Sequence, residues 1–266
     1  MKFQKILITG GSRGIGRSFV DLFLKDNCEV HVVSRNFKNK PENSNLLFHS
    51  FDLSKTKDIC QFCEDFILNH GVPDLLINNA GSGAFYEWNQ FPENEIHNQI
   101  NLLFFSPVLI CRTFAPAMAE AGKGKIINIS SLATLYSLPY MPLYNAGKSA
   151  LSSFTRSMIL EYENYPKFMD LLVGDVNTEF NSRVSKRDTA VRRSRKMESS
   201  WIQIEKQLFD SPNPKVVASR ILKKIEKPSS SVNYEGSFSH RILFPLFCRF
   251  LPEFLKNKIL QRRYFR

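Results

Sequence analysis

The order of apolar and polar positions along the chain alternates between two patterns. Short apolar runs rich in β-branched and aromatic residues predict strands, and stretches with apolar residues three and four positions apart predict helices. Strands that alternate with helices predict an α/β fold, in which a doubly wound parallel sheet is covered by helices on both faces. The strands are expected over residues 3–9, 28–35, 46–54, 74–81, 125–130 and 168–175, and the helices just after the first strand and over 55–69, 94–121, 143–164 and 214–226.

A glycine-rich loop separates the first strand from the first helical pattern. Gly10, Gly14 and Gly16 have the spacing G-x-x-x-G-x-G rather than the strict G-x-G-x-x-G. A strand, a glycine loop and a helix N-terminus form a geometry in which backbone N–H groups hold a phosphate. The spacing alone also fits a tight turn between strand and helix. It therefore favours nucleotide binding without deciding it.

The end of the second strand bears on which dinucleotide would bind. An NAD enzyme usually places Asp or Glu there, where the carboxylate binds the ribose 2′-OH. In this chain the strand ends in Ser34 and Arg35, and Arg13 stands in the glycine loop. Two cations without a carboxylate fit a 2′-phosphate, so NADP(H) is preferred over NAD(H). The alternative is that both arginines are simply solvated.

Tyr144 and Lys148 lie four residues apart in a predicted helix, and Ser131 precedes the tyrosine by thirteen residues. Residues i and i+4 share one helix face, so the phenol and the ammonium can converge. A nearby cation favours the phenolate of tyrosine, whose ordinary pKa is about 10. With a serine hydroxyl beside them, these groups can move a proton to or from a carbonyl or alcohol oxygen. The pair by itself could equally be a surface tyrosine above a lysine.

Length and composition bound the class of protein. The 266 residues, of which 43% are hydrophobic, suit one large domain with a buried core. No uninterrupted apolar run reaches about 18 residues, and the first residues lack the features of a signal peptide, so a cytoplasmic protein is expected. Five scattered cysteines, including Cys60 and Cys63, are expected to be reduced. The five histidines show no ligand spacing, so no metal site is expected.

The net charge of +11 is concentrated in two segments, residues 186–196 and 241–266. The basic residues of the first segment are Lys186, Arg187, Arg192, Arg193, Arg195 and Lys196. This pattern indicates either a solvated loop or a cationic surface for an anionic head group, an acyl carrier or a membrane. The second combines seven basic residues with many Leu and Phe side chains, and Pro245 and Pro252 divide it into short pieces. Such a segment can lie in a membrane interface, pack over its own pocket or a partner subunit, or, least in keeping with the pattern, bind nucleic acid.

These residues together give a family signature. From residue 3 to about residue 236, the chain resembles the short-chain dehydrogenase/reductase family. The residues that carry the resemblance, all in family order, are Thr9, Gly10, Gly14, Gly16, Asn78, Asn79, Ala80, Gly81, Asn101, Ser131, Tyr144 and Lys148. The resemblance implies a single-domain Rossmann fold, an NAD(P)-dependent oxidoreductase, and a homodimer or homotetramer formed through the two long helices.

The resemblance also implies a role for each matching residue. Tyr144 would be the general acid in reduction, and Ser131 rather than Ser130 would orient the carbonyl. Lys148 would hold the nicotinamide ribose and lower the tyrosine pKa, and Asn101 would anchor a water for proton relay. Hydride transfer itself is the chemistry of the cofactor. The cofactor contacts expected on this basis are Gly10, Ser12, Arg13, Gly14, Ile15, Gly16, Ser34, Arg35, Asp52, Leu53, Asn79, Ala80, Gly81, Tyr144, Lys148, Gly174, Val176 and Thr178.

One departure from the family pattern follows the sixth strand. The family usually has Pro-Gly there, followed by a hydroxyl residue that touches the nicotinamide carboxamide. Here Val173 replaces the proline, Gly174 and Thr178 are in place, and Asp175 is introduced near the cofactor. The change removes no catalytic group.

The expected organisation is one NADP-binding catalytic domain over residues 1–239, with a variable substrate lid at 179–212 and a basic, apolar extension at 240–266. The expected activity is NADPH-dependent interconversion of a carbonyl and an alcohol on a hydrophobic, lipid-like substrate. One alternative is a 3-oxoacyl-carrier-protein reductase, because a basic lid suits an acidic carrier. Another is a non-catalytic NADP(H)-binding sensor or scaffold. Peripheral membrane contact through 240–266 is expected to be possible, and no nucleic-acid partner is expected.

Overall fold

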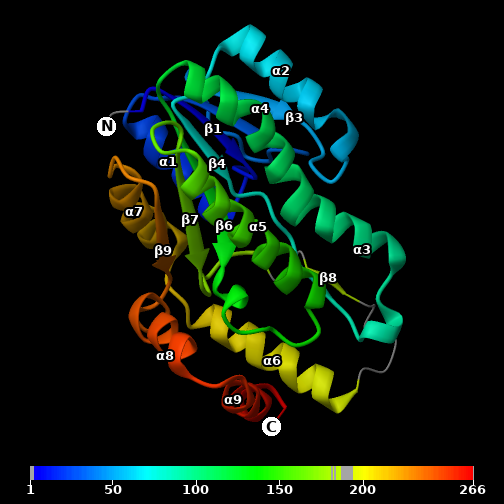
Figure 1. Ribbon diagram of the computed structural model, residues 1–266. Helices are drawn as coiled ribbons and strands as arrows, with labels where there is room; N and C mark the ends of the chain where they lie inside the picture. The colour runs from blue at the N-terminus through cyan, green and yellow to red at the C-terminus, as the bar shows by residue number, and fades with distance from the viewer. Residues whose placement is uncertain (1–2, 181, 183, 187–193, 266) are drawn as a thin grey trace.

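A parallel sheet of seven strands organises the computed structural model of the chain, which describes residues 3–180, 182, 184–186 and 194–265. The strand order is β3-β2-β1-β4-β6-β7-β9, and every neighbouring pair is parallel. The order reverses between β1 and β4, which is the switch point where doubly wound sheets bind ligands at their carboxyl ends. Figure 1 shows the helices on both sides of this sheet and the C-terminal helices at its carboxyl end. The predicted fold class is confirmed.

The six predicted strands are all present, with ends that differ by a few residues. Their bounds are β1 Lys5–Thr9, β2 Glu29–Ser34, β3 Leu46–Ser50, β4 Leu75–Asn78, β6 Lys125–Ser131 and β7 Lys167–Val173. A seventh strand that the sequence pattern did not reveal, β9 (Ser231–Glu235), pairs with β7 at the edge of the sheet. Its alternation is weak, because only Glu235 is fully buried in it. Two short strands, β5 (Ala84–Phe85) and β8 (Ser185–Lys186), form a separate pair.

The helices cover the sheet as two layers. Helices α1 (Gly14–Lys25) and α7 (Pro214–Ile225) cover one face, where Phe19 of α1 and Val217 and Ile221 of α7 pack in one core with apolar side chains of the strands. Helices α2 (Ile59–His70), α4 (Ser106–Glu120) and α5 (Pro142–Glu161) cover the other face, where Phe66 and Phe114 are buried. Burying both faces explains why the strands read as continuous apolar runs.

The long helix predicted over 94–121 is divided. Helix α3 (Glu93–Ile100) is joined to α4 by one wider π-type turn, Asn101–Phe105. Pro107 follows this turn, and Pro116 lies inside α4. The segment Glu93–Glu120 has the length and hydropathy of a membrane span. Its buried side chains, including Cys111 and Met118, pack in the core against the sheet, as in the core helix of a globular domain.

The helix expected over 55–69 begins later than the pattern predicts. Helix α2 begins at Ile59, after the 3₁₀ turn Thr56–Asp58. Before that turn, the amide and hydroxyl of Ser54 both donate to the carboxylate of Asp52. This local turn competes with helix capping, since Asp and Ser side chains readily bond nearby backbone.

The C-terminal extension packs on the catalytic domain along one side. It consists of a π turn (Ser239–Leu243), α8 (Phe244–Phe250) and α9 (Glu253–Tyr264). Tyr264 is only 1% exposed and belongs to a cluster with Phe85 and Trp201, and the Ser200 hydroxyl donates to the Tyr264 carbonyl at 3.2 Å. Trp201 lies on α6 (Arg195–Phe209), a helix within the predicted lid. The side of the extension that carries Tyr264 therefore packs on its own domain, as one of the interpretations of the sequence predicted.

Candidate active site

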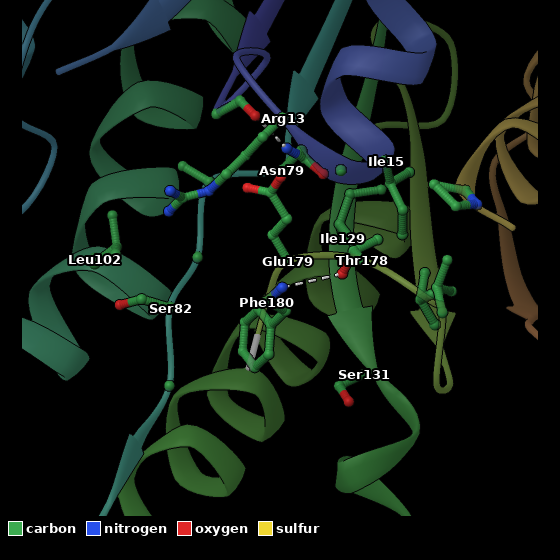
Figure 2. A pocket seen from close by; sticks show the side chains of 18 of the residues that line it. Arg13, Ile15, Asn79, Ser82, Leu102, Ile129, Ser131, Thr178, Glu179 and Phe180 are labelled. Carbon is green, nitrogen blue, oxygen red and sulfur yellow. Dashed lines mark hydrogen bonds between the residues drawn. The ribbon is translucent and has the colours of Figure 1, made fainter. Parts of the chain in front are cut away.

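A cavity of about 1200 Å³ opens at the carboxyl ends of the strands, on both sides of the switch point. All of the site residues predicted from the sequence line it except Gly16 and Asn101. Figure 2 shows Arg13 and Asn79 at one end of this cavity and Ser131 at the other, with Ile15, Ile129 and Thr178 between them. The chain thus brings together residues from the glycine loop to Thr178.

The glycine loop is held against the end of β4 by very short contacts. A side chain at Gly16 would place its Cβ 2.4 Å from the carbonyl oxygen of Gly10, and Gly10 itself has a φ of +68°. Asn79 donates from Nδ2 to the carbonyls of Thr9 and Gly10 at 3.0 and 3.1 Å. Only glycine fits both positions, so the loop and the N-terminus of α1 keep an open cradle. This cradle fits the diphosphate of a dinucleotide, with Gly16 behind the loop rather than on its surface.

Thr9 completes the same junction from inside. Its hydroxyl accepts from the backbone N–H groups of Asn79 and Ala80 at 3.0 and 3.1 Å. Gly81 follows, and a Cβ there would lie 3.7 Å from the Lys148 ammonium. The segment from Asn79 to Gly81 therefore connects the glycine loop to the other end of the cavity.

The end of the cavity beside β2 is cationic. Arg13, Ser34, Arg35 and Lys38 line it. Two carboxylates that share this cavity are already engaged, since Asp21 pairs with Arg17 at 2.8 Å and Asp52 accepts from Ser54. The side chain of Leu53 is buried beside them. Lys38 was missed in the sequence, although its position three residues after Arg35 could have indicated it.

The two neighbouring serines of β6 point to different partners. Successive side chains of a strand face opposite ways. Ser130 donates to the Asp170 carboxylate at 2.5 Å, and Ser152 holds the other oxygen of the same carboxylate. Ser131 lies at the strand end, accepts from the Ala133 N–H at 3.1 Å and neighbours the Tyr144 hydroxyl, and both serines line the cavity. The geometry therefore favours Ser131 over Ser130 as the serine of the site.

Tyr144 and Lys148 project from one face of α5 into the cavity. Burial raises the pKa of Tyr144, and the neighbouring Ser131 hydroxyl opposes that rise. Burial lowers the pKa of Lys148 to about 8, and its ammonium donates to the Ile129 carbonyl at 2.5 Å. The expectation that Lys148 lowers the tyrosine pKa stays a prediction. A raised pKa keeps the phenol protonated at neutral pH.

Asn101 occupies a different place from the other predicted residues. It begins the π turn between α3 and α4, and its Nδ2 donates to the Ser54 carbonyl at 3.1 Å. The cavity wall on this side is formed by its neighbours Gln99 and Leu102. Its expected part in proton relay stays a prediction.

The loop after β7 closes the cavity from the side of the extension. Thr178 lies against Gly14, with 3.5 Å between its Cγ2 and a Cβ placed there, and its hydroxyl accepts from the Phe180 N–H. Gly174 leaves no room for a side chain, because a Cβ would lie 2.5 Å from Nδ1 of His240. Val176 is buried in the core beneath the loop. The replacement of proline by Val173 leaves β7 intact to its last residue.

The basic lid is described only in part. Arg187, Arg192 and Arg193 lie outside the described residues. Lys186 stands over the Trp201 ring at 4.4 Å and Lys196 over the Phe265 ring at 6.0 Å, so these two cations contact aromatic faces.

Three of the five histidines meet on the far side of the sheet from α1. His31, His49 and His70 place one ring nitrogen each within 4.8 Å of the others, which their spacing in the sequence did not indicate. His31 and His49 are 2.9 Å apart, and His31 also contacts Glu29 at 2.7 Å. Two nitrogens on a tetrahedral zinc ion would be about 3.3 Å apart. The His31–His49 pair thus has hydrogen-bond length, and the expectation that the chain holds no metal stays a prediction.

Comparison with known proteins assigns the family. A sequence model described as short chain dehydrogenase matches residues 4–189. The chain belongs to the short-chain dehydrogenase family. The resemblance stated from the motifs is thereby confirmed, and the matched part contains the glycine loop, the serine, the tyrosine and the lysine.

Several curated relatives of this chain are named as reductases. A 3-ketodihydrosphingosine reductase of Bacteroides thetaiotaomicron is 33% identical over 181 residues, 68% of this chain and 66% of that protein. A very-long-chain 3-oxoacyl-CoA reductase of Rattus norvegicus is 28% identical over 59% of this chain and 54% of its own length. An NADPH-dependent 1-acyldihydroxyacetone phosphate reductase of Saccharomyces cerevisiae is 23% identical over 97% of this chain and 90% of its own. The first two matches therefore span only part of those proteins.

Solved structures agree on the fold. A short-chain dehydrogenase of Burkholderia phymatum in complex with NAD has a TM-score of 0.74 at 19% identity, covering 86% of this chain and 88% of that one. An alcohol dehydrogenase of Thermococcus sibiricus complexed with 5-hydroxy-NADP has a TM-score of 0.68 at 19% identity, covering 87% and 96%. The fold thus accommodates either dinucleotide.

Substitution of Tyr144→Phe is expected to lower turnover roughly a hundredfold to ten-thousandfold, the usual contribution of a positioned proton donor. Cofactor affinity should change little, because the ring that contacts Phe180 at 5.8 Å between centroids is kept. Fluorescence titration and steady-state rates measure the two effects. Turnover retained in the Phe variant would contradict the assignment of Tyr144 as the proton donor, and Tyr162→Phe, outside the cavity, serves as the control.

Proposed function

We propose that this chain is an NADPH-dependent oxidoreductase that reduces the carbonyl of a hydrophobic, lipid-like substrate. The observation that carries the proposal is the arrangement of one cavity. Cations line the end beside β2, the glycine cradle lies in the middle, and Ser131, Tyr144 and Lys148 meet at the other end. A bound nicotinamide cofactor would supply the hydride.

The residues of the chain divide the remaining work. A carbonyl oxygen near Ser131 and Tyr144 receives hydrogen bonds from both hydroxyls, which polarises the carbonyl and stabilises the negative charge that develops on its oxygen. Tyr144, whose phenol is protonated at neutral pH, donates the proton. In this family the lysine at the position of Lys148 holds the nicotinamide ribose. Lys148 would thereby fix the nicotinamide ring beside the carbonyl.

NADPH rather than NADH is favoured by the charges around the end of β2. Arg35 and Lys38 are exposed there, and the side chain of Arg13 extends from the glycine loop. Arginine binds phosphate through several N–H groups in one plane, so it suits a 2′-phosphate. The yeast relative, whose name includes NADPH, agrees with this preference.

Replacing Arg35→Ala should weaken NADPH binding roughly tenfold or more and leave NADH binding nearly unchanged, because only NADPH carries the 2′-phosphate. Fluorescence titration with both dinucleotides measures the effect. Lys40→Ala removes a nearby exposed cation outside the cavity and serves as the control. An equal loss for both dinucleotides in the Arg35 variant would contradict NADPH preference through this residue.

A hydrophobic substrate is favoured by the wall near the tyrosine. Leu138, Met141, Phe180, Ile204 and Leu208 line the cavity there. Met141 and Ile204 belong to the same apolar cluster as Tyr264 of the extension. The name of the rat relative states a very-long-chain substrate, which agrees with such a wall.

Catalytic efficiency should rise with the length of an alkyl ketone by up to about fourfold for each added methylene, until the apolar wall is covered. Initial rates of NADPH oxidation with a ketone series measure this. Ketones of equal length that end in a carboxylate should gain far less. A catalytic efficiency that does not change with chain length would contradict the hydrophobic substrate. Absence of turnover with every ketone would favour a carrier-bound substrate or a non-catalytic sensor.

We also propose that the outer side of the extension binds an anionic membrane surface. Phe247, Phe250 and Phe254 are 62%, 77% and 70% exposed. Basic residues, among them Arg249 and Lys258, alternate with these rings. Interfacial segments typically combine apolar side chains, which enter the headgroup region, with cations, which contact anionic lipids.

A homodimer or homotetramer formed through α4 and α5 is proposed only because such oligomers are usual in the family.

Binding to vesicles of anionic lipid should fall at least about tenfold in the double variant Phe247→Glu and Phe250→Glu. The variant replaces two rings that would enter the membrane with negative charges that anionic lipid repels. Sedimentation with vesicles measures it. Leu68→Glu, at an 84% exposed position on α2 at the opposite end of the molecule, is the matched control. Point variants are preferable to deletion of 240–266, since deletion would also uncover the cluster around Tyr264. Equal binding by wild type and the double variant would contradict the proposal.

A further inference from the structure

Asp175 is a carboxylate at the reacting end of the cavity that the proposed mechanism does not use. It follows β7 by two residues, and Val173 at the end of β7 is the register partner of Ser131 on β6. Asp175 lines the cavity together with Tyr136 and Tyr144. Its negative charge helps to raise the pKa of Tyr144, so it lies within electrostatic reach of the proton donor.

The carboxylate of Asp175 lacks a hydrogen-bond donor within the part of the chain that the structure describes. Nε2 of His240 is 3.7 Å from Oδ2, which is within ion-pair range but too long for a hydrogen bond, and burial lowers the pKa of His240, which favours the neutral imidazole. Arg263 influences Asp175 from farther away, and its guanidinium lies over the Phe244 ring at 5.9 Å. Tyr136, Tyr144 and Tyr264 are the other titratable groups that sense its charge. The side chain is 28% exposed and lines the cavity, so water or a ligand in the cavity can reach the carboxylate.

A largely buried carboxylate without a donor is unfavourable, and burial accordingly raises the pKa of Asp175. The same carboxylate would bind a cationic N–H donor strongly once that donor enters the cavity. It would repel an anionic group in the same place. The position thus selects for the charge of the substrate close to its carbonyl.

We propose that Asp175 binds a protonated amine carried on the carbon next to the reacting carbonyl, so that the substrate is a long-chain α-amino ketone. This inference rests on the proposed reductase function, and adds the substrate class to it. Ser131 and Tyr144 hold the oxygen, the apolar wall from α6 holds the chain, and Asp175 holds the amine. The three contacts together fix which face of the carbonyl is presented.

Asp175 could instead serve only to fix the extension through His240. That role predicts an equal loss for every ligand when the carboxylate is removed. The proposed role predicts a loss only for ligands that carry the amine. The two can therefore be separated by a matched pair of ligands.

The experiment is isothermal titration calorimetry of the full chain loaded with NADP⁺. One ligand is an alkyl amino alcohol, with the amine next to the hydroxyl, long enough to reach the apolar wall and short enough to stay monomeric. The other is the same alcohol without the amine. Wild type should bind the amino alcohol roughly tenfold to a hundredfold more tightly, and Asp175→Asn should remove that preference while it binds the plain alcohol as before. Asp210→Asn, at an exposed position outside the cavity, should keep the preference.

Three results would overturn the inference. Wild type could show no preference for the amine, Asp175→Asn could keep the preference, or Asp175→Asn could weaken both ligands equally. Rates with the matched α-amino ketone and plain ketone then test the proposed function separately. Preferential binding of the amine without reduction of either ketone would refute the reductase function and leave the assignment of Asp175 standing.

Discussion

The close approach of the glycine loop to the end of β4 is the constraint on which the site depends. Gly16 packs against the Gly10 carbonyl so tightly that a Cβ would lie 2.4 Å from its oxygen, and Asn79 bonds to the same loop. This contact joins the two halves of the sheet at the switch point. Without it, the phosphate cradle and the end of β6 would have no common frame, because they belong to segments more than a hundred residues apart.

Buried polar contacts position the chemistry from beneath. Asp170 holds Ser130 and Ser152, which ties β7, β6 and the catalytic helix α5 together. Asn128 of β6 accepts from Asn78 and donates to Thr155, each at 2.8 Å. These contacts satisfy polar groups in the core and specify one register of strand and helix. Ser131 and Tyr144 thereby face one point, although neither bonds directly to this network.

The extension links the substrate end of the cavity to the outer surface. On its inner side, Tyr264 packs in the apolar cluster that contains the wall residues Met141 and Ile204, and His240 packs against the loop after β7. Glu235, fully buried, pairs with Arg220 and Lys224 of α7 at 2.9 and 2.8 Å and fixes the strand from which the extension departs. The outer side leaves phenylalanine rings in solvent. A pocket for a hydrophobic substrate and a surface suited to lipid are thus two sides of one short segment.

The sequence by itself determined the strand and helix order, the glycine loop and the tyrosine–lysine pair, because each depends on periodicity or on spacing within one element. It also favoured Ser131 over Ser130. Tertiary structure alone decided what long-range packing controls. It divided the helix over 94–121, placed β9 at the sheet edge, and gave the extension a buried side and an exposed side. It also raised the pKa of Tyr144 through burial and set Asp175 beside the reacting end, since burial and proximity come from segments that no local pattern relates.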